Sequence, residues 1–240
     1  MPDGPPHLTE SAQRLHAVVR TLLSRGVWLV LMSQMMLILS LQWQVAEGES
    51  PLLAALAISL TALALLLFFY LQAGAFHGLA QGRDALSVEQ VLRGGKVVFS
   101  TFVWLILKAG LLLMAVINVI TLFVVFAGGY DLKATTQLLT SVFGPVSGLL
   151  SFIFAYWLPW VFVRRDFNLL PSLRAGLRVA WTRLPQSTFL ALVILAPLLV
   201  ALFLPADGPL WLDLAASMVA GILGWVAYVY CVEVLQEAPP

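Results

Sequence analysis

Charged residues are scarce in this sequence. They make up 10% of its 240 positions, while hydrophobic residues make up 61%. Soluble domains carry about 25% charged residues on average. A chain with so few charges cannot cover a hydrophobic core with a water-facing surface, which excludes an ordinary soluble domain. The composition therefore predicts an integral membrane protein, with the lipid bilayer as its solvent.

Cysteine and histidine are also rare. Cys231 is the single cysteine, which excludes an intrachain disulfide and a cysteine-based metal site. His7, His16 and His77 lie outside the long apolar runs, so a pair of haem ligands inside the membrane is excluded as well. We therefore expect neither a metal nor a cofactor.

Sequence motifs for catalysis are missing too. The chain has no HExxH, GxSxG or P-loop pattern, and its predicted aqueous loops are too short to hold a catalytic domain. Nucleic-acid binding is not indicated, because the basic residues lie beside apolar runs and no aromatic platform accompanies them. We expect a protein that is not an enzyme and has no nucleic-acid partner.

Six long apolar runs dominate the chain. They cover residues 27–45, 52–73, 99–126, 138–163, 184–204 and 210–235. Each is close to or above the roughly 20 residues that a helix needs to cross about 30 Å of hydrocarbon. We predict an all-α polytopic membrane protein in which six transmembrane helices form a single domain over residues 1–240.

Two short basic segments resemble each other, and each leads into a long apolar run. The first is SVEQVLRGGKVVFS (87–100) and the second is LLPSLRAGLRVAWT (169–182). Leu92-Arg93-Gly94-Gly95 aligns with Leu173-Arg174-Ala175-Gly176. Ser87 and Gln90 also have the spacing of a helix capping box. We expect both segments to be helices near the membrane plane, each bending into its span.

A third segment, residues 8–25, is amphipathic at helical spacing but lacks the motif. This pattern is typical of a helix that lies on the membrane surface, and equally of a surface helix that packs on neighbouring protein. With this segment the chain predicts three repeats, each an interfacial amphipathic helix followed by a helical hairpin. Unit one is 8–75, unit two is 83–165 and unit three is 166–235.

Positive charge is distributed unevenly around the apolar runs. Of the 13 lysine and arginine residues, Lys108 lies within a run and Lys133 at a hairpin tip, which leaves eleven in the segments between hairpins. Basic residues flanking spans stay on the cytoplasmic side of a membrane. We therefore predict that both termini are cytoplasmic.

Lys108 is the one charge deep within a predicted span, about 13 Å along its helix at ~1.5 Å per residue. A charge there costs at least ~2.5 kcal/mol. Gln34 should lie at a similar depth, Glu233 could be a counter-ion, and Asn118 lies further along the same span. One interpretation is a polar site for a lipid headgroup or another anionic ligand. The other is a lysine that reaches the headgroups and anchors its span, with Asn118 bonding between helices.

The basic segments allow two interpretations as well. Their charges can serve to orient the protein, or they can bind anionic lipid. The candidates for lipid contact are Arg93, Lys96, Arg174 and Arg178.

Residues 74–195 resemble a loose group of bacterial six-span inner-membrane proteins, which includes the membrane region of some glycerophosphodiester phosphodiesterases. The resemblance lies in LQAGAFHGLAQGRDALSVEQVLRGGKVVF and WLPWVFVRRDFNLLPSLRAGLRVAW. The phosphodiesterase domain itself is absent, so no catalytic residue can be transferred. The resemblance implies a protein of the bacterial inner membrane with an accessory function.

We expect an accessory or scaffold subunit that packs against other integral membrane proteins and against membrane lipids. The alternative is a small transporter or lipid-handling protein that uses a polar site near Lys108. A transporter should carry several polar groups at mid-membrane between its repeats. Such groups are few in this sequence, which favours the accessory role.

Overall fold

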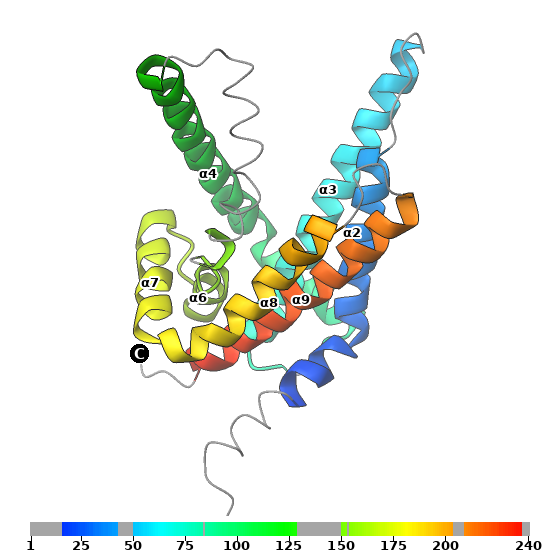
Figure 1. Ribbon diagram of the computed structural model, residues 1–240. Coiled ribbons are helices and arrows are strands. Elements are labelled where there is room, and N and C mark those ends of the chain that lie inside the picture. Colours follow the sequence, from blue (N-terminus) through cyan, green and yellow to red (C-terminus); the bar gives the residue numbers. More distant parts are fainter. Residues whose placement is uncertain are drawn as a thin grey trace, which may run out of the picture.

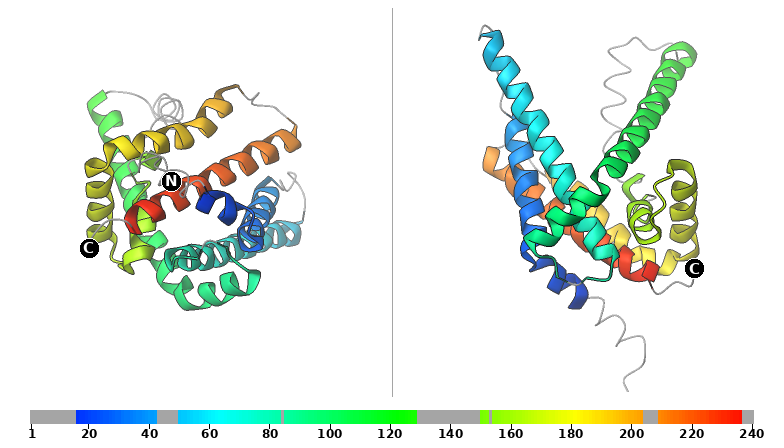
Figure 2. Two further views of the ribbon diagram at one scale, coloured as in Figure 1. Left: turned by 90° about the horizontal axis from the view of Figure 1, so that it is seen from below. Right: turned by 180° about the vertical axis from the view of Figure 1, so that it is seen from behind.

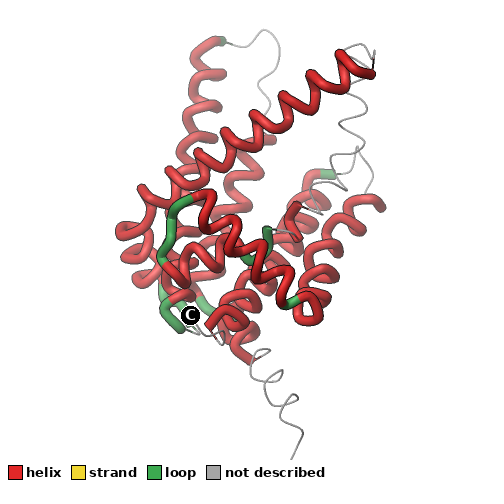
Figure 3. The backbone as a smooth tube through the Cα atoms, turned by 90° about the vertical axis from the view of Figure 1, so that its left-hand side faces the viewer, coloured by secondary structure: helices red, strands yellow, loops and turns green. Residues whose placement is uncertain are grey.

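The computed structural model describes residues 16–42, 50–83, 85–128, 150–152, 154–203 and 209–236. Within these ranges the chain is helical and contains no strand (Figure 3). Its principal helices are α2 (Arg25–Gln42), α3 (Pro51–Ala80), α4 (Val88–Gly128), α6 (Trp157–Arg164), α7 (Leu169–Thr182), α8 (Leu184–Phe203) and α9 (Leu210–Gln236). A short helix at 16–22 precedes α2.

Four of these helices are long and apolar enough to cross a membrane. They are α2, α3, α9 and the 88–123 part of α4. The α7–α8 pair would be a fifth span if the two helices are counted as one, although they are bent by 109°. The prediction of an all-helical membrane protein is therefore confirmed. Residues 138–149 and 153 of the predicted run 138–163 lie outside the described residues.

The helices are arranged as pairs that cross at an angle. Figure 1 shows α2 beside the middle and lower part of α3, while α8 and α9 lie side by side and run diagonally past both. The C-terminal part of α3 crosses the N-terminal part of α4, and the two helices diverge from there (Figure 2). The core therefore lies at the crossing, and the far parts of α3 and α4 extend away from it.

Glycines allow the backbones of α3 and α4 to touch at this crossing. A Cβ atom at Gly74 would lie 1.9 Å from the carbonyl oxygen of Val91. One at Gly95 would lie 2.8 Å from the carbonyl oxygen of Tyr70. No residue with a side chain fits between backbones this close. The Tyr70 hydroxyl adds a hydrogen bond of 2.7 Å to the carbonyl oxygen of Leu92.

Aromatic side chains fill the space beside the crossing. The rings of Phe76 and Tyr228 are stacked with their centres 3.9 Å apart, which joins α3 to α9. The Tyr228 hydroxyl donates a 3.4 Å hydrogen bond to the carbonyl oxygen of Phe76. Phe102 of α4 and Phe162 of α6 meet Phe76 edge-on. These contacts bury large rings from four helices in one cluster.

The first basic segment is part of α4. The predicted capping box is confirmed, since the Ser87 N–H donates to Gln90 Oε1 at 2.9 Å and the Gln90 N–H donates to Ser87 Oγ at 3.2 Å. The helix then runs from Val88 to Gly128 without interruption. The boundary that we predicted between an interfacial helix and a span is therefore absent here.

The second basic segment is a separate helix, α7. It ends at Thr182, and α8 begins at Leu184. Gly176 of α7 packs on α6, where a Cβ atom at this position would lie 2.9 Å from the Trp157 Cα atom. Trp157 Nε1 donates a 3.0 Å hydrogen bond to Ser172 Oγ. In this copy the predicted bend from segment to span is present.

The helix α3 is longer than the sequence suggested. It continues past the predicted end of the run, residue 73, to Ala80. The reason is that residues 74–80 contain no proline and keep regular helical geometry until Gly82, whose φ of 75° ends the helix. His77, which follows the predicted apolar run 52–73, therefore lies in the last turn of α3.

Candidate functional site

Lys108 lies on an exposed face of α4. Its Nζ atom is 5.2 Å from the centre of the Trp104 ring, one turn earlier in the helix. Long helical side chains lean toward the N-terminus of their helix, which brings the ammonium group over the aromatic face. The contact is within one helix and involves no second span. This geometry is what an anchoring lysine requires.

Gln34 is part of the contact between α2 and α9. Its Nε2 atom donates a 3.4 Å hydrogen bond to the Ser217 carbonyl oxygen. Its Oε1 atom lies against Gly221, where a Cβ atom would be 2.8 Å away. The absence of a side chain at Gly221 therefore makes room for the Gln34 amide between the two helices.

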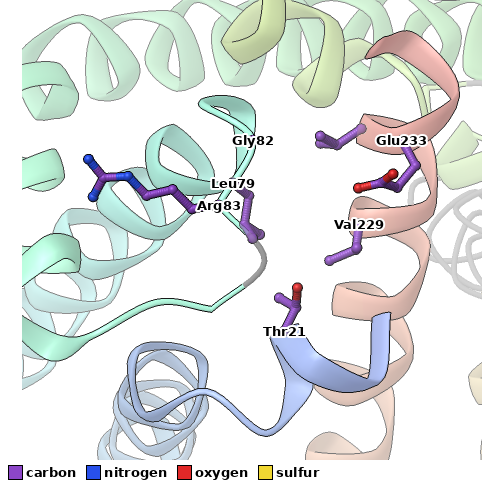
Figure 4. A pocket seen from close by; sticks show the side chains of 7 residues that line it. Thr21, Leu79, Gly82, Arg83, Val229 and Glu233 are labelled. Atoms are coloured by element: carbon purple, nitrogen blue, oxygen red, sulfur yellow. The ribbon is translucent and has the colours of Figure 1, made fainter. Parts of the chain in front are cut away.

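Glu233 lies in a different part of the molecule, at the C-terminal end of α9. Its side chain lines a pocket of only about 10 Å³, which is the space of one water molecule. Thr21, Leu79 and Gly82 line the same pocket. Figure 4 shows the Glu233 carboxylate directed toward this space, while the guanidinium group of Arg83 points away from it.

Asn118 is exposed on α4, and its Nδ2 atom donates a 2.8 Å hydrogen bond to the Met114 carbonyl oxygen of the same helix. The structure therefore does not assemble the predicted polar site. Lys108 and Asn118 share α4, but Gln34 lies between α2 and α9, and Glu233 does not pair with Lys108. The apolar sequence gave no sign of which helix faces meet.

The four candidates for anionic-lipid contact are all exposed. They are Arg93, Lys96, Arg174 and Arg178, from the first turns of α4 and the middle of α7. Arg93 forms an ion pair with Glu89 one turn earlier. Exposed pairs of this kind contribute about 0–1 kcal/mol to stability. The remaining charges are free to meet headgroups.

A larger cavity, which the sequence did not reveal, lies between α2, α3, α6, α8 and α9. Its volume is about 640 Å³, and it is partly open to the surroundings. The described lining is mostly aromatic and aliphatic, and its polar members are Gln34, Gln72, Ser151 and the hydroxyl of Tyr228. The sequence feature that points to this cavity is the spacing of Phe68, Gln72 and Phe76 on α3, which places a polar residue within an aromatic stripe.

Comparison with protein-family models, with curated proteins and with solved structures finds no match for this chain. The fold and the sites described above therefore define its class by themselves. It is a helical membrane protein with exposed polar groups on α4 and a cavity between α2, α3, α6, α8 and α9.

Proposed function

We propose that the protein is an accessory or scaffold subunit of a bacterial inner-membrane assembly, with six spans in three repeats and both termini in the cytoplasm. It would bind other integral membrane proteins through the outer face of α4. The remaining helices would hold α4 in place.

The observation that carries this proposal is a row of exposed residues on α4 that includes a lysine, an alanine and an asparagine. Lys108, Leu111, Ala115 and Asn118 recur at intervals that place them along one face of a helix. All four are exposed among the described residues. An amide group gains little from facing hydrocarbon, whereas small and amide side chains are typical of contacts between membrane helices.

The contrast with α9 supports the same assignment. In the most apolar part of α9, 44% of the residues are buried by the rest of the described chain, against 6% in α4. The most apolar part of α3 is also 6% buried, so both helices that diverge from the crossing have exposed outer parts. The exposed part of α4 is free for lipid or for another protein, and its polar groups favour protein.

The arrangement of the helix ends supports the proposed orientation. Figure 1 shows the start of α2, the end of α3, the start of α4 and the end of α9 toward one end of the molecule. The segments next to these ends carry Arg25, Arg83, Arg93 and Lys96. Positive residues that gather at one end of a membrane protein are retained in the cytoplasm.

The orientation can be tested with single cysteines in a Cys231→Ala background. We expect a cysteine at Ser50 to react with an impermeant thiol reagent added outside intact cells, and one at Ala85 to be protected. The reverse pattern would overturn the proposed orientation.

The proposed partner contact can be tested by photo-crosslinking in native membranes. A photoreactive residue at Ala115 should yield one discrete protein adduct, and the adduct should disappear with Asn118→Leu. Leu113, on the opposite face of α4, is the matched control and should label lipid. Equal lipid labelling at both positions, or an adduct with a second copy of this chain, would contradict an accessory role.

The alternative function, a lipid or transport site near Lys108, has less support. Lys108 lines neither of the two cavities described above, and its ammonium group lies over the Trp104 ring of its own helix. We therefore expect Lys108→Arg to preserve the folded yield in detergent, since arginine also reaches the headgroups.

A further inference from the structure

The cavity of about 640 Å³ between α2, α3, α6, α8 and α9 has the size of a ligand-binding site. Such sites measure roughly 300–1,000 Å³ and combine apolar walls with a few polar groups. The accessory role proposed above uses the outer face of α4 and leaves this cavity unassigned. Its walls come from apolar helices, and its partial opening gives access from the surroundings.

Two glutamine side chains are the first feature that points to a ligand. Gln72 of α3 is half-buried, and within the described chain its amide makes no hydrogen bond. Gln34 of α2 uses its Nε2 atom in a long bond to Ser217, and its Oε1 atom has no recorded donor. Among the described residues no fully buried side-chain nitrogen or oxygen lacks a hydrogen-bond partner, so these unpaired amide atoms are accessible and not sealed in the core. A bound group that accepts and donates hydrogen bonds can therefore reach them.

The charge of the lining is the second feature. No aspartate, glutamate, lysine, arginine or histidine is among the described residues that line the cavity. An ionised headgroup would therefore be buried without a counter-charge, which is strongly unfavourable. An uncharged hydroxyl or carbonyl group meets no such penalty and matches the hydrogen-bonding capacity of two amides.

The walls are the third feature. Trp157, Trp225 and Tyr228 present aromatic surface to the cavity, and Val193 and Ile194 present aliphatic surface. This lining suits a hydrocarbon chain, because van der Waals contact with packed side chains is the main attraction available inside a bilayer. Gly224 lines the same space, and a Cβ atom placed on it would meet nothing within 4 Å.

We infer that the cavity binds one molecule of an uncharged membrane lipid. Its hydroxyl or carbonyl head bonds to the Gln34 and Gln72 amides, and its hydrocarbon chain lies along the aromatic wall. Two sources share this chemistry: a diacylglycerol or an isoprenoid quinone of the host membrane.

Tryptophan fluorescence of the purified full-length protein in detergent can test the inference. The probes are a diacylglycerol with brominated chains, a quinone with a decyl chain, and a phosphatidylglycerol with the same brominated chains. Bromine and quinone both quench tryptophan at short range. We expect saturable quenching by at least one uncharged probe, with binding by the phosphatidylglycerol at least about tenfold weaker. Which uncharged probe binds more tightly identifies the source.

Variants locate the site. Gly224→Leu should place a side chain inside the cavity and weaken quenching strongly, while Gly110→Leu, at an equally open glycine on α4, should leave it unchanged. Gln72→Leu should weaken binding about tenfold, the loss expected for about 1.4 kcal/mol of hydrogen bonding. Gln81→Leu, at the end of the same helix but outside the cavity, is its control.

The role of the aromatic wall has its own control. Trp225→Phe should reduce the quenching amplitude, whereas Trp211→Phe, an exposed position on the same helix, should not. Equal binding of phosphatidylglycerol, or full binding by Gly224→Leu, would overturn the inference. Neither result would affect crosslinking at Ala115, so the inference and the accessory role can fail separately.

Discussion

The two basic segments of the chain begin alike and end differently. In each, a glycine touches the backbone of the preceding helix: Gly95 touches α3 at Tyr70, and Gly176 touches α6 at Trp157. Beyond the glycine, α4 continues to Gly128, whereas α7 ends at Thr182 and α8 leaves at 109°. The same kind of glycine contact is therefore followed by a continuous helix in the first segment and by a sharp turn in the second.

A proline accounts for the difference. Pro185 is the second residue of α8, and Trp104 is its counterpart in the alignment of the two segments. Proline lacks an N–H group and clashes with the carbonyl group of the residue four positions earlier. It also disfavours helical geometry in the residue before it. We therefore expect Pro185 to contribute to the break between α7 and α8, and its absence from α4 to allow that helix to continue.

The comparison extends to the preceding helices. Phe68, Tyr70 and Phe76 of α3 have the same spacing as Phe154, Tyr156 and Phe162. The rings of Phe76 and Phe162 meet with their centres 5.5 Å apart. Phe76 and Phe162 therefore hold matching positions in the two segments, and their ring contact joins α3 to α6.

The largest effect should follow from closing the glycine contact in the first copy. Gly74→Ala would place a Cβ atom 1.9 Å from the Val91 carbonyl oxygen, where backbone meets backbone. We expect a loss of about 3 kcal/mol or more, above the usual range for overpacking. Thermal unfolding in detergent measures it. Gly224→Ala is the control, and equal stability of the two variants would contradict the close crossing.

A proline at the matching position of α4 should reproduce the turn of the other copy. Trp104→Pro should cost about 3 kcal/mol and introduce a kink. Spin labels at Lys96 and Leu113 measure this directly, since 17 residues of uninterrupted helix span roughly 26 Å. The distance should shorten in the variant. An unchanged distance would mean that packing, and not proline, sets the direction of the helix.

The glycine contact in the second copy should be less sensitive. A Cβ atom at Gly176 would lie 2.9 Å from Trp157, at the first turn of α6. A small shift of α6 can relieve this contact, so we expect Gly176→Ala to cost about 1–3 kcal/mol. Unfolding in the same detergent gives the comparison. A larger loss of stability than for Gly74→Ala would contradict the prediction that the α3–α4 contact is the tighter of the two.

The smallest effects should come from the hydrogen bonds beside each glycine. Tyr70→Phe removes the bond to Leu92, and Ser172→Ala removes the bond from Trp157 Nε1. Each loss should reduce the free energy of unfolding by about 1 kcal/mol. If Tyr70→Phe alone has an effect, the two copies use their anchors differently.

Several local features could be read from the sequence because neighbouring residues decide them. The capping box needs Ser87 and Gln90 at a fixed spacing, and the structure forms it. Other predictions depended on distant residues. The proposed partner of Lys108 was Glu233, but Glu233 lines a small pocket with Thr21 and Leu79, whereas Lys108 lies over Trp104.

The sequence by itself determined that the chain is helical and apolar, where most spans lie and which segments carry positive charge. These properties follow from the length of each run and from the cost of placing charge in hydrocarbon. The tertiary structure alone decided which helix faces meet, where α3 and α4 diverge and that Gln34 and Gln72 share a cavity. The reason is physical: lipid-facing and protein-facing positions are both apolar in a membrane, so hydrophobicity does not distinguish them.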